Sequence, residues 1–303
     1  MNRLLMLVAA LDLLFPSAAS AIDCAKAASR TEKMICADPQ LAQLDAVLNK
    51  DYPAYVAKQG KDTAKRLQKE WLREVRDACA DADCLKTEYK GRIRELSGAE
   101  EIFVSRRLSP EWDAVISASS CNEHGCHGPA TVDLFAADST TLAQRISLEM
   151  LFVRLEKECD GAPAENGTLL GIETNDVNFD GYGDFIFCEG AGSHSGYFDV
   201  YLYDPTRDRF VLNKALTKVA GTGWLTVNAE EKTLTIYYKD GPLLNFTSTY
   251  EVREDAPVLV KVVTESLSYP DDSGYQDVTI TTKERVDGKW REREKTERRK
   301  EYE

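Results

Sequence analysis

The side chains with the clearest chemistry lie in one short acidic segment in the second half of the sequence. Residues 176–184 follow a D-x-N-x-D-G-x-x-D pattern, built from Asp176, Asn178, Asp180, Gly181, Tyr182 and Asp184. In such a loop the side chains at positions 1, 3, 5 and 9 and the carbonyl at position 7 offer oxygen to a hard cation, and the glycine makes the turn. Three carboxylates so close together repel one another unless a cation lies between them. We therefore predict a structural Ca²⁺ site with Asp176, Asn178, Asp180, the Tyr182 carbonyl and Asp184 as ligands.

This loop does not have the full EF-hand pattern. Position 12 is Phe187 instead of glutamate, so Glu189 or an acid from elsewhere would have to complete the ligand shell. The alternative is a polar turn without metal, closed by hydrogen bonds from side chains to the backbone.

A glycine-rich segment follows, from Glu189 to Tyr197. Small residues surround a polar tip, so the segment can protrude and approach another surface closely. The residues that would make contact are Ser193, His194, Ser195, Gly196 and Tyr197. His194 occupies the centre, which excludes the G-x-S-x-G nucleophile elbow. We predict an exposed contact loop, with an ordinary hairpin connection as the alternative.

Eight cysteines provide a third kind of chemistry. They are Cys24, Cys36, Cys79, Cys84, Cys121, Cys126, Cys159 and Cys188. An even number in an exported chain predicts disulfides, and we expect the first four to pair among themselves. Cys121 and Cys126, with His124 and His127 nearby, could bind zinc. On a glycine-containing loop in an oxidising compartment, a disulfide between these two cysteines is the favoured prediction.

The composition does not favour an enzyme or a nucleic-acid-binding protein. The chain has three histidines and no Ser/His/Asp or Cys/His arrangement that the sequence brings together. Residues 98–282 carry 13 Lys and Arg against 30 Asp and Glu, a net charge of −17. With so many acids, a pair of carboxylates has no diagnostic value, and the charge argues against nucleic acid as a partner.

The N-terminus predicts export. A basic start, an apolar run from Leu4 to Phe15 and an A-x-A step at 19–21 form a secretory signal cleaved before Ile22. The apolar run is too short to span a bilayer. We expect a soluble protein of the periplasm, or a secreted one, with no membrane anchor.

Two halves of different periodicity would position these residues. Residues 24–97 have apolar side chains at helical spacing, with Asp38 and Asp62 as N-caps and Pro39 in a first turn. After about residue 100 the period becomes two. Expected strands are 101–106, 112–117, 185–188, 198–203, 209–212, 225–228, 233–238, 246–252, 258–263 and 277–282, with a helix near 142–156.

These patterns predict an α+β protein. A signal peptide (1–21) precedes a helical hairpin domain (22–97) and a mainly antiparallel β domain (98–290), either propeller-like or a sandwich, that carries the EF-hand-like calcium loop. A charged tail (291–303) is expected to fray from about Lys289.

The helical half resembles the LprI-type lysozyme-inhibitor N-terminal family. The match runs through Cys24, Glu32, Ile35, Cys36, Leu41, Leu44, Asp45, Leu48, Asn49, Tyr52, Gln68, Trp71, Leu72, Arg76, Cys79, Cys84, Leu85, Tyr89, Arg92, Ile93 and Leu96. The spacing between Cys79 and Cys84 is shorter than is usual in that family. The resemblance implies an envelope module, and lysozyme inhibition in some members.

Residues from about 165 to 290 resemble periplasmic immunity proteins that neutralise lysozyme-like effectors of type IV secretion. The acidic loop, the glycine-rich segment before Tyr197 and the strand Asp199–Asp204 carry this resemblance. It implies a propeller-like fold with a calcium site. Short strands with D-x-N-x-D-G loops also occur in FG-GAP adhesion repeats.

Both resemblances imply a lysozyme-like peptidoglycan hydrolase as the protein partner. We expect an inhibitor or immunity protein that inserts the loop Ser193–Tyr197 into the hydrolase cleft. The alternative is a calcium-dependent envelope adhesion or scaffold module without inhibitory activity.

Overall fold

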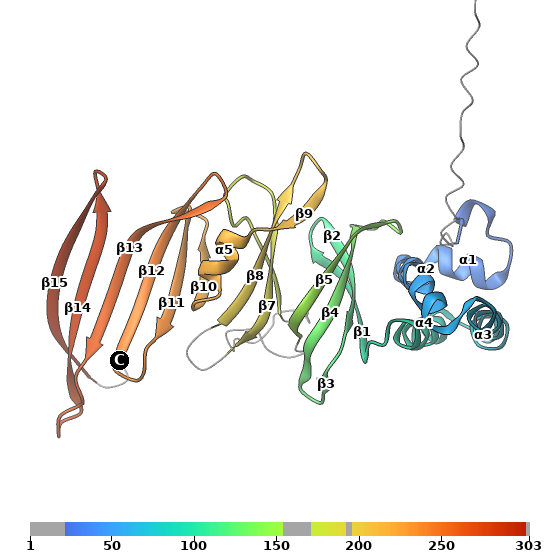
Figure 1. Cartoon of the computed structure of the whole chain (residues 1–303), viewed down its shortest axis with the longest axis horizontal. Coiled ribbons are helices and arrows are strands. Elements are labelled where there is room, and N and C mark those ends of the chain that lie inside the picture. Colours follow the sequence, from blue (N-terminus) through green and yellow to red (C-terminus); the bar gives the residue numbers. More distant parts are fainter. Residues whose placement is uncertain (1–21, 154–170, 192–195, 301–303) are drawn as a thin grey trace, which may run out of the picture.

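The computed structural model describes residues 22–153, 171–191 and 196–300. Helices come first and strands afterwards, as the change of periodicity predicts (Figure 1). The helices are η1 (Cys24–Lys26), α1 (Arg30–Ala37), α2 (Pro39–Gln59), α3 (Lys61–Glu74), η2 (Arg76–Ala78), α4 (Ala82–Ser97) and, among the strands, α5 (Lys214–Ala220). None of the helices in the described part of the chain is long and apolar enough to cross a membrane.

Helix boundaries follow their capping residues. Ser29 and Glu32 form a capping box at the start of α1, and the Asp38 side chain accepts a hydrogen bond from Gln40 N at the start of α2. Gly60, and not Asp62, is the N-cap of α3. Asp62 lies instead in the first turn, where its negative charge is favourable to the helix dipole.

The described part of the β region contains three antiparallel sheets. The first has β1 (Glu101–Ser109), β2 (Trp112–Ala118), β3 (Cys121–Asn122), β4 (Gly125–Ala136) and β5 (Leu142–Val153). The second has β6 (Ile172–Asn175), β7 (Asp184–Ala191), β8 (Gly196–Asp204) and β9 (Arg209–Leu212). The third has β10 (Trp224–Asn228), β11 (Thr233–Lys239), β12 (Leu244–Arg253), β13 (Ala256–Leu267), β14 (Tyr275–Val286) and β15 (Lys289–Lys300).

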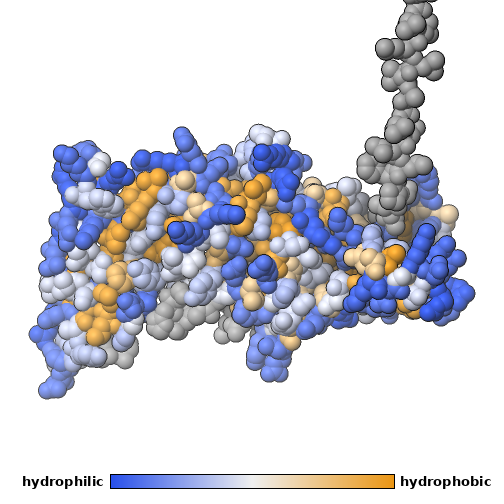
Figure 2. Space-filling view, viewed as in Figure 1, coloured by the Kyte–Doolittle hydropathy of each residue, from blue (hydrophilic) through white to orange (hydrophobic). Residues whose placement is uncertain are grey.

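The sheets follow one another in a row, and α5 lies between the second and third sheets (Figure 1). One hydrophobic core joins the first and second sheets, and another joins the second sheet, α5 and the third sheet. Antiparallel strands were expected and are found. A closed ring of sheets is not seen in the described ranges. Figure 2 shows apolar side chains over β12 and β13, whose residues are mostly only partly buried.

The helical half and the first sheet share a core. Ile102, Val115 and Phe135 of the sheet pack in the same cluster as Leu41, Leu44, Trp71 and Tyr89 of the helices. Gln43 of α2 is fully buried, and its Nε2 donates to Asp113 Oδ2 of β2 at 3.0 Å. The helices are therefore attached to the sheet by packing as well as by the chain connection.

Two further expectations from the sequence are wrong. The expected helix near 142–156 is the strand β5 over its described part, where Ile146 and Leu148 are buried and Ser147 is exposed. The charged tail does not fray from Lys289, because β15 pairs with β14 along its whole length, from Val286↔Lys289 to Tyr275↔Lys300. Opposite charges across this pair, such as Lys283 and Glu292 at 3.3 Å, fit the pairing.

Three disulfides join cysteines close in sequence: Cys24–Cys36, Cys79–Cys84 and Cys121–Cys126. The first two confirm that the first four cysteines pair among themselves, and the third confirms the prediction for the Cys121 loop. Cys188 is also disulfide-bonded. Cys159 lies outside the described residues, as does the predicted signal segment 1–21.

Candidate functional site

The acidic loop folds as a tight turn held by its own side chains. Asp176 Oδ1 accepts from Asp180 N at 3.0 Å, and Asp176 Oδ2 accepts from Gly181 N at 2.9 Å. Asp180 Oδ1 in turn accepts from Tyr182 N at 2.9 Å. Gly181 has φ +93°, a conformation that the absence of a Cβ permits. The sharp turn that the sequence predicts is therefore present.

Asp184 leaves this turn and enters the protein interior. It is the first residue of β7 and only 1% exposed. Its carboxylate accepts from Val177 N at 2.8 Å and from Tyr203 N at 2.9 Å, which fastens the loop to β8. Burial raises the pKa of Asp184 to about 7, and the two backbone donors oppose that rise.

The oxygen donors of the loop are of the kind that calcium prefers. Within residues 22–153, 171–191 and 196–300, no three His, Cys, Asp or Glu side chains come together in a way that could hold a metal ion. Instead, the carboxylates of Asp176, Asp180 and Asp184 accept hydrogen bonds from backbone N–H groups. Glu189, the suggested additional ligand, lies further along β7. Calcium binding by this loop stays a prediction.

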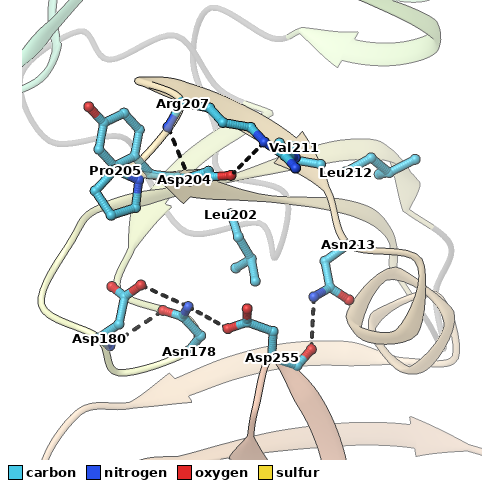
Figure 3. Close-up of a pocket in the computed structure, with 11 residues that line it drawn as sticks. Asn178, Asp180, Leu202, Asp204, Pro205, Arg207, Val211, Leu212, Asn213 and Asp255 are labelled. Carbon is cyan, nitrogen blue, oxygen red and sulfur yellow. Dashed lines mark hydrogen bonds and ion pairs between the residues drawn. The ribbon is translucent and has the colours of Figure 1, made fainter.

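A cavity of about 350 Å³ opens beside the loop (Figure 3). Leu202 lies at its centre, with the side chains of the loop on one side and those of the β8–β9 connection on the other. The lining residues are Asn178, Asp180, Leu202, Tyr203, Asp204, Pro205, Arg207, Val211, Leu212, Asn213 and Asp255.

Asn178 links the loop to the third sheet across this cavity. Its Nδ2 donates to Asp180 Oδ2 at 3.0 Å and to Asp255 Oδ1 at 2.8 Å, as Figure 3 shows. Asp255 lies in the tight turn between β12 and β13, with φ +59°. Its carbonyl accepts from Asn213 Nδ2 at 2.8 Å, and Asn213 also caps α5. The cavity is thus a junction between the second and third sheets.

The opposite wall carries one further acid and one base. Asp204 Oδ1 accepts hydrogen bonds from Thr206 N and Thr206 Oγ1. These bonds lower the pKa of Asp204, and the bond from Thr206 Oγ1 has the largest effect. Arg207 lies 3.5 Å from Asp204 and is largely exposed. With three carboxylates and one guanidinium around Leu202 and Val211, the cavity suits a cationic group on an apolar stem.

The two described residues of the predicted contact loop, Gly196 and Tyr197, lie at the other end of the second sheet. Ser193, His194 and Ser195 lie outside the described residues, whereas Gly196 and Tyr197 begin β8. Tyr197 is 51% exposed. The length of β7 separates this end from Asp184, about 23 Å at 3.3 Å per residue. The acidic turn therefore does not directly brace the contact loop.

Two acids, Glu189 and Asp199, lie near the Tyr197 end of the second sheet. Burial is the main cause that raises the pKa of Glu189, and the negative charges of Asp199 and Glu149 raise it further. Burial also raises the pKa of Asp199, and the negative charge of Glu149 adds to this rise.

The two histidines of the Cys121 loop do not form a metal site with it. His127 Nε2 lies 3.0 Å from the Glu189 carbonyl oxygen. His124 is exposed in the turn closed by Cys121–Cys126, so neither histidine accompanies a free thiol.

Sequence reasoning missed Asn213 and Asp255. Asn213 precedes a short apolar helix that interrupts the strands, so its N-cap position carries a weak signal. Asp255 carries none, because its turn shows no Asn-Gly or Asp-Gly pair. Only the packing of the third sheet on the second brings it to Asn178.

Comparison with known proteins shows a partial relationship. No family model matches the chain. Lipoprotein LprI of Mycobacterium bovis and of two Mycobacterium tuberculosis strains is 33% identical to it over 89 residues. That match covers 28% of this chain and 45% of each lipoprotein, so the chain spans less than half the length of these relatives.

Two solved structures are also similar. One, described as a Xanthomonas type IV secretion system related protein, has a TM-score of 0.46 and 21% identity, and covers 64% of this chain and 93% of its own. The other, an endo-arabinase from Bacteroides thetaiotaomicron, has a TM-score of 0.21 and 11% identity, and covers 64% of this chain and 74% of its own. Neither score is high enough to assign the fold of this chain.

Proposed function

We propose that this protein is an envelope inhibitor or immunity protein that binds a lysozyme-like peptidoglycan hydrolase and is not itself an enzyme. The similarity to lipoprotein LprI supports this proposal, as does the family resemblance of residues 22–97. The observation that carries it is the acidic cavity between the second and third sheets. A basic hydrolase can place a lysine or arginine there, with its stem against Leu202 and Val211.

The second contact in this proposal is the loop Ser193–Tyr197. Lysozyme-like enzymes hold two carboxyl groups about 5–9 Å apart in a sugar-binding cleft. Hydroxyl, imidazole and backbone N–H donors of the loop would bind those carboxylates and exclude the glycan. Tyr197, exposed at the start of β8, would pack against the rim of the cleft.

Tyr197 and the cavity lie at opposite ends of the second sheet, so variants can separate the two proposed contacts. Charges around the cavity act mainly on the association rate, since they attract a basic partner at a distance. Donors on the loop act mainly on dissociation, because they make short-range hydrogen bonds to charged groups. The envelope location required by this function is the one expected from the signal sequence and the disulfides.

Titration of cell-wall lysis tests the proposal. Purified lysozymes and secreted lysozyme-like effectors are assayed with wild-type protein, with Ser193, His194 and Ser195 replaced by alanine, and with Asp204→Asn/Asp255→Asn. The loop variant should bind ten-fold or more weakly, because each lost bond to a charged acceptor is worth about 1.5–3 kcal/mol. The cavity variant should associate more slowly, and less so at high salt.

Asp271→Asn is the matched control, since Asp271 is an acid in a turn of the third sheet away from both contacts. It should inhibit like the wild type. Undiminished lysis across the panel at micromolar wild-type protein would contradict the inhibitor function. That outcome would favour an adhesion or scaffold module, for which the row of three sheets provides an extended surface (Figure 1).

A further inference from the structure

Asp45 of α2 is a buried carboxylate held by neutral donors. It is 5% exposed. Its Oδ1 accepts from the Tyr89 hydroxyl at 2.8 Å, and its Oδ2 accepts from Ile22 N at 2.9 Å and Asn49 Nδ2 at 3.1 Å. A phenol, an amide N–H and a carboxamide carry no charge, so these bonds stabilise the carboxylate without neutralising it. A buried charge in this position is costly unless a cation accompanies it.

Ile22 is fixed where it meets this carboxylate. Its side chain packs on the core of the helical half, and it lines a cavity of only about 20 Å³ together with Cys24, Ile35, Ala42, Asp45 and Thr140. The disulfide Cys24–Cys36 ties the segment two residues further on to α1. The packing of the Ile22 side chain and the nearby Cys24–Cys36 disulfide therefore hold the backbone nitrogen of Ile22 next to Asp45.

We propose that cleavage of the chain before Ile22 converts this hydrogen bond into a buried ion pair that locks the helical half. Hydrolysis consumes one water, leaves a carboxylate on Ala21, and gives Ile22 an α-amine that carries the added proton as an ammonium group. The nitrogen that donated one neutral hydrogen to Asp45 then presents a positive charge at the same position. The inference uses the expected cleavage position and is independent of the proposed inhibition.

The groups around Asp45 leave room for this charge. The charge of Arg76 in η2 lowers the pKa of Asp45, but Arg76 is paired with Asp77 at 2.8 Å and also hydrogen-bonds to Tyr89. Burial outweighs Arg76 and the hydrogen bonds, and keeps the pKa of Asp45 above its ordinary value. Tyr89 stays neutral, because burial and Asp45 raise the pKa of its hydroxyl. An ammonium group at Ile22 adds a positive charge within hydrogen-bonding distance of Asp45 Oδ2.

The ion pair between the Ile22 α-amine and Asp45 predicts that the free energy of unfolding decreases at alkaline pH. The α-amine has an ordinary pKa of about 7.7–8.0, and a buried carboxylate partner raises it in the folded state. The added stability is then fully present below about pH 8 and is lost as the pH rises through the raised pKa of the amine.

The test compares the exported chain beginning at Ile22 with one carrying an extra Gly-Ser between Ala21 and Ile22, each with and without Asp45→Asn. Mass spectrometry establishes the first residue, and urea unfolding is measured from pH 6 to pH 11. We expect the folding constant of the Ile22 chain to exceed that of the extended chain by about ten-fold or more near pH 7, since one unit of pKa shift corresponds to a factor of ten. The difference should vanish in the Asp45→Asn pair and at high pH.

A second measurement covers the case in which Asp45→Asn does not fold. In the wild-type chain, NMR titration of the Ile22 α-amine should give a pKa at least about one unit above the ordinary value of 7.7–8.0. Three results would each overturn the proposal: a mature chain that begins at another residue, equal stability of the two N-termini at pH 7, or an α-amine that titrates at its ordinary pKa.

Discussion

Arg145 on β5 donates two hydrogen bonds to Asp133 on β4, from Nε to Oδ1 and from Nη2 to Oδ2, each 2.7 Å long. Asp133 is fully buried, and the remaining Nη1 of Arg145 binds Asp51 of α2. One guanidinium thus joins two strands of the first sheet to the longest helix. Burial raises the pKa of Asp133, and Arg145 opposes that rise.

Arg145→Met should destabilise the protein by about 3–5 kcal/mol, because it leaves two carboxylates buried without their cation. Urea unfolding at pH 7 measures the loss. Arg106→Met is the control: its ion pair with Asp138 is about half exposed on both sides and should contribute less than about 1 kcal/mol. Similar effects of the two substitutions would show that Arg145 is not a structural clamp.

The predicted calcium site can be tested through thermal stability. If Asp176, Asn178, Asp180, the Tyr182 carbonyl and Asp184 bind Ca²⁺ in the range of about 10⁻⁴–10⁻³ M typical of extracellular sites, the Tm should rise with millimolar calcium. Asp180→Ala should abolish that rise. Asp271→Ala also removes backbone hydrogen bonds from an acidic turn, but should leave the calcium response intact. Equal responses of wild type and Asp180→Ala would identify the loop as a turn only.

The acid pair on β7 and β8 predicts a pH dependence of stability. The pKa values of Glu189 and Asp199 are raised in the folded state, chiefly by burial. The folded state therefore binds protons more tightly than the unfolded state, and stability falls as the pH rises through the raised values. Asp199→Asn should make this fall shallower in unfolding experiments between pH 3 and pH 7.

Asp271→Asn serves as the opposite case. Several hydrogen bonds, the one from the Ser273 side chain first among them, lower the pKa of Asp271 in the folded state. Ionised Asp271 therefore stabilises the protein at pH values above the ordinary pKa of an aspartate, and this stabilisation is lost as the pH falls. The substitution should therefore weaken stability near neutral pH and reduce acid sensitivity. A pH profile unchanged by Asp199→Asn would show that the acid pair is fully solvated.

Gly171 sits where no other residue fits. It has φ +100°, and a Cβ there would lie 1.7 Å from the carbonyl oxygen of Phe152. Gly171→Ala should unfold or strongly destabilise the second sheet, because the clash would move the Gly171 carbonyl, which accepts a hydrogen bond from Cys188 N at 2.7 Å. Gly183→Ala has open space around the new methyl group and should change the Tm little. Comparable Tm values for both variants would mean that the β5–β6 contact is not fixed.

The sequence alone determined the features that depend on local order. All ten expected strands are present, because alternation with period two records which face of each strand is buried. The Asp38 cap with Pro39 in the first turn, the turn at Gly181 and the Cys121–Cys126 disulfide are local in the same sense. Each depends on side chains within a few residues of one another.

Only the tertiary structure decided the features that depend on distant partners. Residues 142–153 read as a helix by their mixed pattern, but β4 offers a strand edge and Asp133 a partner for Arg145, so they pair as β5. β15 is ordered by β14, despite a composition that favours solvent. Packing of sheet on sheet brings Asp255 to Asn178, and folding of the N-terminus onto α2 brings Ile22 to Asp45. Contacts across 77 and 23 residues leave no periodic trace in a single sequence, because the free energy that forms them comes from burial shared by whole elements.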